Sequence, residues 1–275
     1  MNNLVPLLVA IPLGAGFLIP LAVRWQPRLA EWLSILVSAG LVAISVSLIG
    51  REVTYHVGDW TTPNGIDLRV DALTTLMLLM INGLALIVTI YSADYMQRYS
   101  SHHRYYSLLM FLVAGTNGVA VTGDLFNLYV FMEITAIASY ALVAFTGEDE
   151  AFEASFKYVV LGGLSSSVIL IGITLVYAMT GTLNMSHLAS RLSDSGEAEP
   201  IKFALALFFC GFGLKAALVP FHTWLPDAYP AAPAPISAIL SGVVSKVIGV
   251  YVLARLLFNI FGISDESLLL MRWMG

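Results

Sequence analysis

Long apolar stretches separated by short polar segments run along almost the whole chain. Most of them approach the roughly 20 residues that an α-helix needs to cross a hydrocarbon core about 30 Å thick. The pattern therefore predicts an all-α polytopic membrane protein. About eight candidate spans are present, at residues 4–23, 30–50, 71–93, 106–122, 124–146, 153–180, 201–229 and 235–260.

Two polar segments interrupt this pattern for longer than a tight turn requires. Residues 51–70 are rich in turn formers, and their PNG run favours a short hairpin outside the membrane. Asp71 follows directly and is typical of a helix N-cap. Residues 181–200 form the second long loop, in which the SHLASRL stretch predicts a short surface helix.

Arginines in the short loops indicate an orientation. The loops after the first and third spans carry Arg24, Arg28, Arg98 and Arg104. Positively charged short loops stay on the cytoplasmic side, so we expect the N-terminus outside. Because no basic side chain precedes Arg24, residues 4–23 are expected to be a retained transmembrane helix, not a cleaved signal peptide.

Composition supports the membrane assignment and excludes several other classes. Of 275 residues, 58% are hydrophobic and only 11% are charged, whereas a soluble domain carries roughly 25% charged residues. The net charge of −5 argues against nucleic-acid binding. Cys210 is the single cysteine, and no phosphate-binding glycine motif occurs. We therefore expect no catalytic residue, metal or cofactor in this chain.

Ionisable residues inside the predicted spans are the first functional signal. Three of the four lysines, Lys157, Lys215 and Lys246, lie at least four residues inside a span, and Glu133 lies near the middle of the fifth. Each such group costs about 2.5–3.5 kcal/mol near the bilayer centre unless it is paired or hydrated. A protein that retains several of them is expected to use them in proton or ion transfer.

Lys246 has a distinctive setting in the eighth span. Serines recur every four residues before it, and two glycines bracket it at helical spacing: Ser237, Ser241 and Ser245, and Gly242 and Gly249. Small residues leave room for a close helix or for water. The alternative is a lysine that extends its amine to the membrane surface.

Lys157 and Glu133 differ in the partners that their own helices offer. Glu153 precedes Lys157 by four residues, the favourable order for an ion pair on one helix. This pair fits a stabilised helix end as well as it fits a transport role. Glu133 has no basic residue at these spacings, so its partner must come from another helix. That partnership can be functional or a simple structural ion pair.

Pro220 is expected to break the seventh span. Proline has no N–H, so the carbonyl four residues earlier loses its helical donor. The first half-helix should end just after Lys215, with free carbonyls and the negative end of its dipole beside the amine. His222 and Asp227 follow the break and can hold water and pass protons. The alternative is a simple kink.

At these residues the chain resembles the antiporter-like subunits of respiratory complex I and of Mrp-type cation/proton antiporters. The resemblance covers nearly the whole chain. Its strongest parts are GDLFNLYVFMEITAIASYAL and KAALVPFHTWLPDAYPAAPAPISAILSGVVSK. The hairpin segment GDWTTPNGIDLRVDALTTLMLL is more similar to the Mrp D-subunit and its relatives in membrane-bound hydrogenases.

The resemblance implies a role for each matched residue. Glu133 and Lys215 correspond to the pair whose coupling drives proton transfer. Lys246 corresponds to the basic residue that relays protons onward, and His222 to the histidine after the break. Lys157 is a weaker correspondence. The implied architecture is three leading helices (1–105), a five-helix repeat (106–260) and a short tail (261–275).

Family members usually have about fourteen helices, built as two inverted repeats after the leading helices. The second repeat is not part of this sequence. We therefore expect either a second chain that supplies the remainder or a specialised half-subunit. The implied partners are other membrane subunits of an Mrp-like, hydrogenase-like or complex I-like assembly in the inner (plasma) membrane.

The resulting hypothesis is a proton-translocating subunit that moves protons through buried lysines under the control of Glu133. It has no redox centre of its own, although its complex could be a translocase such as an NADH:quinone oxidoreductase or a membrane-bound hydrogenase. One alternative is a structural membrane anchor that has lost complete translocation. Another is a self-contained transporter for a small solute, which the absence of an internal repeat disfavours.

Overall fold

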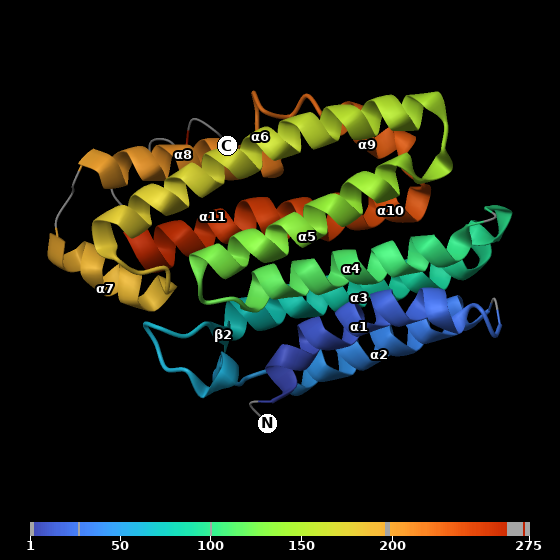
Figure 1. The fold of residues 1–275 in the computed structure, drawn as a ribbon, viewed down its shortest axis with the longest axis horizontal. Helices are drawn as coiled ribbons and strands as arrows, with labels where there is room; N and C mark the ends of the chain where they lie inside the picture. Colours follow the sequence, from blue (N-terminus) through green and yellow to red (C-terminus); the bar gives the residue numbers. More distant parts are fainter. Residues whose placement is uncertain (1–2, 27, 100, 196–198, 263–271, 273–275) are drawn as a thin grey trace.

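Long helices lie side by side along one axis of the molecule (Figure 1). The computed structural model describes residues 3–26, 28–99, 101–195, 199–262 and 272. Most of the tail expected over residues 261–275 lies outside these described residues. The prediction of an all-α polytopic membrane protein is confirmed.

Six segments are long and apolar enough to cross a membrane within the described residues. They are α1 (Leu4–Ala22), α2 (Leu29–Ser47), α3 (Ala72–Tyr95), α5 (Leu125–Val143), α6 (Asp149–Thr180) and the last span, Ala234–Phe261. Two further helices run along the same axis, α4 (His102–Val121) and α8 (Glu199–Lys215). The first starts with the polar HHRYYS stretch, and the second has 17 residues because it breaks inside the bundle.

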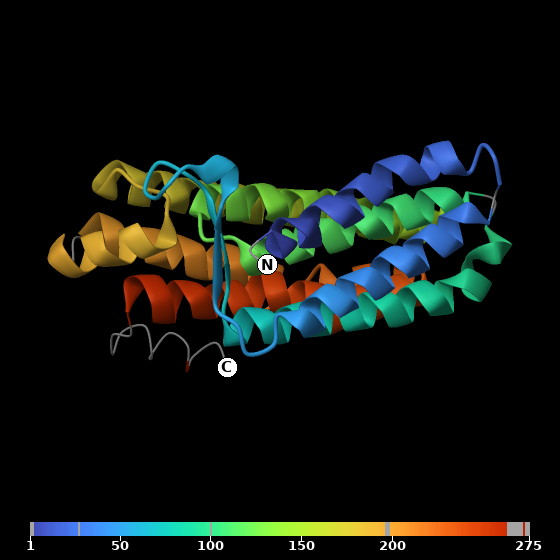
Figure 2. The ribbon, with the colours of Figure 1, turned by 90° about the horizontal axis from the view of Figure 1, so that it is seen from below.

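A β-hairpin lies across one end of the bundle (Figure 2). Strand β1 (Val53–His56) pairs antiparallel with β2 (Asp67–Val70), and α7 (Met185–Ser195) lies at the same end. The backbone of the α4–α5 connection joins both, because Gly123 N–H donates to Asp67 and its carbonyl accepts from Met185. We call this end of the molecule the hairpin end and the opposite one the turn end.

Short elements complete the chain. They are η1 (Val57–Asp59), η2 (Met96–Arg98), η3 (Ala144–Thr146), α9 (Leu225–Ala231), α10 (Ala234–Ile239), η4 (Leu240–Val244), η5 (Lys246–Tyr251), α11 (Val252–Arg255) and η6 (Leu256–Phe261). Of these, η4, η5 and η6 are π-helical, so the last span is locally widened by i→i+5 bonding. Residues four apart therefore do not stay on one face of this span.

A buried polar network joins the leading helices. The Asn117 amide donates to the Asn82 side chain and to the Leu8 carbonyl, both at 3.0 Å, and Asn82 donates to Ser45 at 2.9 Å. Helices in a membrane gain little from excluding lipid, so interhelical hydrogen bonds and close packing hold them together. This network fixes α1, α2, α3 and α4 as one frame.

Gly249 lets the last span approach the end of α8. A Cβ at this position would overlap the backbone and side chain of Ala216, the residue directly after Lys215. Gly163 on α6 is the contrasting case, because an added Cβ there meets nothing within 4 Å. Gly249 therefore positions η5 against the region that also holds the central lysine.

Gly249→Ala is expected to lower the melting temperature of the purified chain in detergent. Forcing one extra methyl into a packed contact costs about 1–3 kcal/mol. Gly163→Ala should leave the melting temperature unchanged or raise it, because alanine favours a helix over glycine by up to about 1 kcal/mol. Equal effects of the two substitutions would show that the contact between Gly249 and Ala216 is not tight.

Candidate functional site

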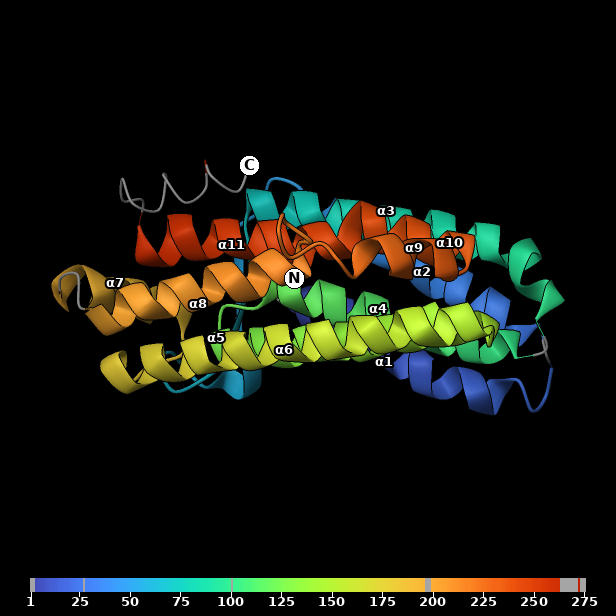
Figure 3. The same ribbon diagram turned by 90° about the horizontal axis from the view of Figure 1, so that it is seen from above.

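Lys215 lies at the last position of α8, in the interior of the bundle. Helix α8 ends partway along the bundle, and α9 continues toward the turn end (Figure 3). The Lys215 side chain is only 6% exposed. An ammonium group is thus placed where lipid and water are both largely excluded, and its surroundings must stabilise it.

The end of α8 has a defined geometry. Ala217 adopts a left-handed conformation with φ of 56°, and the next residues fold back onto the helix. Leu218 N–H donates to Gly213 and Ala217 N–H to Leu214, the bonding pattern of a Schellman cap. The helix therefore stops five residues before Pro220, and the peptide bond before this proline is cis.

This cap limits which carbonyls are free at the break. The sequence predicts that the Ala216 carbonyl loses its helical donor, whereas the carbonyls of Gly213 and Leu214 accept the bonds of the cap. Leu214 also accepts a bond of 3.0 Å from the Trp224 indole. The chain that follows a helix end can fold back and satisfy its carbonyls. The carbonyls of these two residues are thus not the ligands of the lysine.

Glu133 on α5 provides the carboxylate nearest to the lysine. Its Oε1 lies 4.0 Å from Lys215 Nζ, and the same oxygen accepts a hydrogen bond from Ser166 on α6. The Glu133 side chain is 30% exposed and is thus less buried than the lysine. A separation of 4.0 Å gives Coulomb attraction without a direct hydrogen bond.

A small cavity of about 10 Å³ adjoins the lysine. Its walls come from α5, α6, α8 and the last span: Ala136, Ser139, Tyr158, Lys215, Val244, Ser245 and Ile248. This volume is near the minimum that holds one water molecule. Lys215 Nζ has no hydrogen-bond partner among the described residues. One water in the cavity would accept from the ammonium and bond to the surrounding hydroxyls.

Hydroxyl groups extend from this cavity toward α9. Ser245 lines the cavity and lies 2.8 Å from the Tyr229 hydroxyl. Ser237 donates to the Tyr229 backbone carbonyl at 2.6 Å. The Tyr158 ring stacks on Trp224 with centroids 4.3 Å apart, which holds the segment after the break against α6. These hydroxyl groups form a line of polar atoms that leads from the lysine toward α9 through an otherwise apolar interior.

Lys157, Glu153 and Asp227 form a separate ion-pair cluster. Lys157 Nζ lies 2.8 Å from both Glu153 Oε1 and Asp227 Oδ2, and all three side chains are at least 43% exposed. Exposed pairs of this kind contribute little to stability, because water screens the charges. The structure does not bring this cluster to Lys215, and its geometry favours the interpretation of a stabilised helix end.

His222 and Lys246 also lie apart from the central pair. His222 is exposed in the segment between α8 and α9, and Lys246 is exposed at the start of η5. The neighbours of Lys246, Ser245 and Val247, are buried. The structure therefore places the Lys246 side chain on the outer face of the bundle and not in the cavity beside Lys215.

Several site residues were missing from the sequence prediction. Ser139, Tyr158, Ser166 and Tyr229 surround or extend the central pair. The SSS run in an apolar span was an available signal for Ser166. No comparable signal marked Tyr158 or Tyr229, because aromatic residues are common in any membrane helix.

Family comparison agrees with this geometry. Residues 122–274 match a family described as "NADH:quinone oxidoreductase/Mrp antiporter, TM". Residues 60–106 match "NADH-Ubiquinone oxidoreductase (complex I), chain 5 N-terminus". The chain belongs to the NADH:quinone oxidoreductase/Mrp antiporter family. The matched residues include Glu133, Lys215 and Lys246.

Relatives of this antiporter family include proteins from different complexes. The chain is 36% identical over 283 residues to the D-subunit of the Na(+)/H(+) antiporter of Bacillus subtilis, covering 100% of the chain and 57% of the relative. It is 36% identical over 280 residues to NADH-quinone oxidoreductase subunit N of Desulforudis audaxviator, covering 99% and 55%. The chain spans little more than half the length of these relatives.

Solved structures show the same fold in multi-subunit membrane complexes. A chain of the membrane-bound sulfane sulfur reductase, an archaeal respiratory complex, superposes with a TM-score of 0.92 at 35% identity, covering 100% of this chain and 57% of that one. A chain of the Mrp complex from Dietzia gives 0.85 at 32%, covering 94% and 49%. The antiporter-like fold is thus shared over the matched half.

The central pair of this antiporter-family chain is expected to respond asymmetrically to substitution. Glu133→Gln leaves a buried ammonium without its carboxylate and should cost a few kcal/mol. Lys215→Met has a similar length and leaves only a partly exposed carboxylate that Ser166 still supports. We expect a clearly lower melting temperature for Glu133→Gln and little change for Lys215→Met.

Raising the pH should partly restore the stability of Glu133→Gln, because deprotonation removes the unpaired charge of Lys215. The double variant, Glu133→Gln with Lys215→Met, provides the control and should show no such recovery. Thermal melts in one detergent at several pH values provide the measurement. Equal destabilisation by both single variants would contradict this account of the pair.

Proposed function

We propose that this chain is the proton-transferring half of an antiporter-like subunit in a multi-subunit complex of the plasma membrane. The observation that carries the proposal is Lys215, buried at a helix end, with Glu133 at 4.0 Å and a water-sized cavity beside it. A structural ion pair would gain most from direct contact. Here the carboxylate is held at a distance by Ser166.

The pair can work as a proton switch. Burial favours the neutral amine of Lys215, whereas the Glu133 carboxylate favours the ammonium. A displacement of Glu133, or a change of charge beside it, would shift this balance and release or recruit a proton. Glu133 is partly exposed, so a neighbouring subunit can act on it electrostatically.

The cavity gives the released proton a direction. A water beside Lys215 Nζ can transfer it to the hydroxyls of Ser245 and Tyr229, which are 2.8 Å apart. Proton transfer requires donors and acceptors within about 2.6–3.2 Å of each other, directly or through one water. The stack of Tyr158 on Trp224 holds the segment after the break in position, and with it the hydroxyls of this route.

Lys246 would continue the route outside this bundle. Its side chain is exposed on a membrane span, where contact with lipid would cost about 2.5–3.5 kcal/mol. Curated relatives and solved relatives extend well beyond the matched region. We infer that further helices, on this polypeptide or on another subunit, cover this face and receive protons from Lys246.

Three substitutions test the proposed function in proteoliposomes of the complex purified through this chain. Glu133→Gln, Lys215→Met and Lys246→Met should each reduce coupled proton or cation flux by roughly 100-fold or more, because each removes a transfer group. Lys157→Gln is the matched control, since it removes a lysine from the peripheral cluster. It should retain most of the flux.

Subunit content, measured on the same preparations, separates transport from assembly. The proposal requires that Lys215→Met complexes have a normal composition but no flux. Wild-type flux in all three variants would instead support the structural-anchor alternative, particularly if their complexes lacked subunits. If only Lys246→Met showed normal flux, the proposed role of Glu133 and Lys215 would stand. The proposed transfer of protons onward through Lys246 would be wrong.

A further inference from the structure

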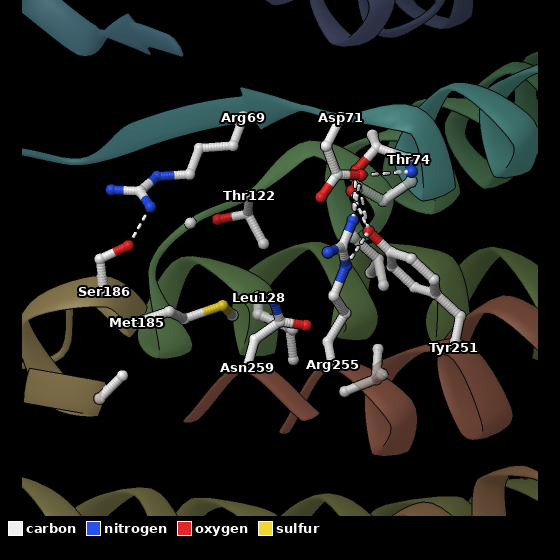
Figure 4. Close-up of a pocket in the computed structure, with 15 residues that line it drawn as sticks. Arg69, Asp71, Thr74, Thr122, Leu128, Met185, Ser186, Tyr251, Arg255 and Asn259 are labelled. Atoms are coloured by element: carbon white, nitrogen blue, oxygen red, sulfur yellow. Dashed lines mark hydrogen bonds and ion pairs between the residues drawn. The ribbon is translucent and has the colours of Figure 1, made fainter. Parts of the chain in front are cut away.

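A second, larger cavity lies at the hairpin end and is not used in the proposed transfer route. Its volume is about 360 Å³, within the roughly 300–1,000 Å³ of small-molecule sites. Its walls come from the start of α3, the α4–α5 connection, α7 and the end of the last span. Figure 4 shows Arg69 and Arg255 on either side of the space, with Thr122 between them.

Arg255 and Asp71 form one side of this cavity. Arg255 Nη2 donates to Asp71 Oδ1 at 2.5 Å and to Thr74 at 2.8 Å, and its Nε donates to Tyr251 at 3.1 Å. Its Nη1 has no partner among the described residues. The Thr74 backbone donates to the same Asp71 oxygen, so Oδ2 remains outside these bonds (Figure 4).

Asp71 is charged at physiological pH. Burial alone would raise the pKa of its carboxyl, but the hydrogen bonds from Arg255 and from the Thr74 backbone outweigh this effect. They hold the pKa of Asp71 at about 2. The cavity therefore presents a permanent carboxylate oxygen close to a permanent guanidinium nitrogen.

Arg69 forms the other side. Its Nε pairs with the fully buried Asp67, which Asn184 also bonds, and its Nη1 donates to Ser186 on α7. No hydrogen bond or ion pair of its Nη2 occurs among the described residues. The charged residues that line this cavity are Arg69, Arg255 and Asp71. The buried Asp67 pairs with Arg69 from outside the lining, so the formal charges of these two ion pairs cancel.

The cavity lies at the level where spans begin and end. The spans that begin at Ala72 and Leu125, and the span that ends at Phe261, contribute residues near these termini to its lining. The ends of membrane-spanning helices mark the lipid headgroup region. Beneath the charged groups the lining is apolar, with Val119, Leu128 and Val252. A cavity with charged groups at the membrane surface and apolar residues deeper in the membrane fits a molecule that has a polar head and an apolar tail.

We propose that this cavity binds the phosphoethanolamine headgroup of a membrane phospholipid. The phosphate would lie between the uncommitted guanidinium nitrogens of Arg69 and Arg255, and the ammonium would donate to Asp71 Oδ2. The glycerol and upper acyl chains would lie on the apolar floor. This inference is independent of the proposed proton transfer.

The charge pattern selects the class of headgroup. A purely anionic headgroup would satisfy the arginines but meet the ionised Asp71 carboxylate without a counter-charge. A choline headgroup has the right charges, but its trimethylated nitrogen has no N–H to donate. A primary ammonium next to a phosphate matches both the guanidinium donors and the carboxylate acceptor that line the cavity.

Lipid-dependent melting of the purified protein tests the site. Phosphatidylethanolamine, phosphatidylcholine and phosphatidylglycerol with identical acyl chains are added separately to the chain in detergent. The ethanolamine lipid should raise the melting temperature by roughly 3–6 °C at saturation, through preferential binding to the folded state. The other two lipids should raise it by less than half as much.

Three variants locate the effect. Ala189→Phe fills the cavity from α7 without altering its charges, and it should abolish the preference for the ethanolamine lipid. Ser190→Phe, at the exposed adjacent position, is the matched control and should keep the preference. Asp71→Asn retains a good helix N-cap residue but should make the ethanolamine and glycerol lipids equivalent.

Each other outcome overturns the proposal. Equal stabilisation by all three lipids would show that lipid stabilises the protein without binding through its headgroup. Equal stabilisation by the ethanolamine and glycerol lipids in the wild type would mean that Asp71 does not bind the ammonium group. A preference that survives in Ala189→Phe would place the site elsewhere. Stabilisation by soluble glycerophosphoethanolamine but not by the lipid would identify a soluble ligand.

Discussion

A lysine ammonium inside an apolar bundle is the constraint on which the rest of the site depends. Lys215 is 6% exposed, so its charge must be balanced from within the protein. The helix that carries it ends there, and Glu133 from another helix supplies the counter-charge at 4.0 Å. Ser166 holds that carboxylate, and the cavity has room for about one water. The ammonium of Lys215 is therefore stabilised without a direct hydrogen bond to a carboxylate. A group that is to release and take up a proton needs this kind of stabilisation.

The balance depends on a rigid frame around a short irregular segment. The chain between α8 and α9 cannot use helical hydrogen bonds, so other contacts must position it. Ala217 closes the cap, Trp224 bonds to the end of α8 and stacks on Tyr158, and Gly249 brings the last span against Ala216. These contacts come from three different helices. A displacement of any of them would alter the distance between Glu133 and the lysine.

The spans and the break were predictable because they depend on local properties. Apolar length specifies a membrane helix, and Lys215 next to Pro220 marks an interruption. Glu133 was predicted to need a partner from another helix, but only the family resemblance identified that partner as Lys215. The Schellman cap at Ala217, the Tyr158–Trp224 stack and the π-helical turns depend on contacts between distant residues. No periodicity in the chain encodes those contacts.

The two polar sites place opposite demands on neighbouring molecules. At the hairpin end, Arg69 pairs with Asp67 and Arg255 pairs with Asp71, so each of these charges has a counter-charge within the described residues. Lys246 is exposed on a membrane span and has no ion pair among the described residues. Lipid cannot balance such a charge at mid-span, whereas helices with polar side chains can. This contrast is the reason that the proposed covering helices are assigned to the face around Lys246.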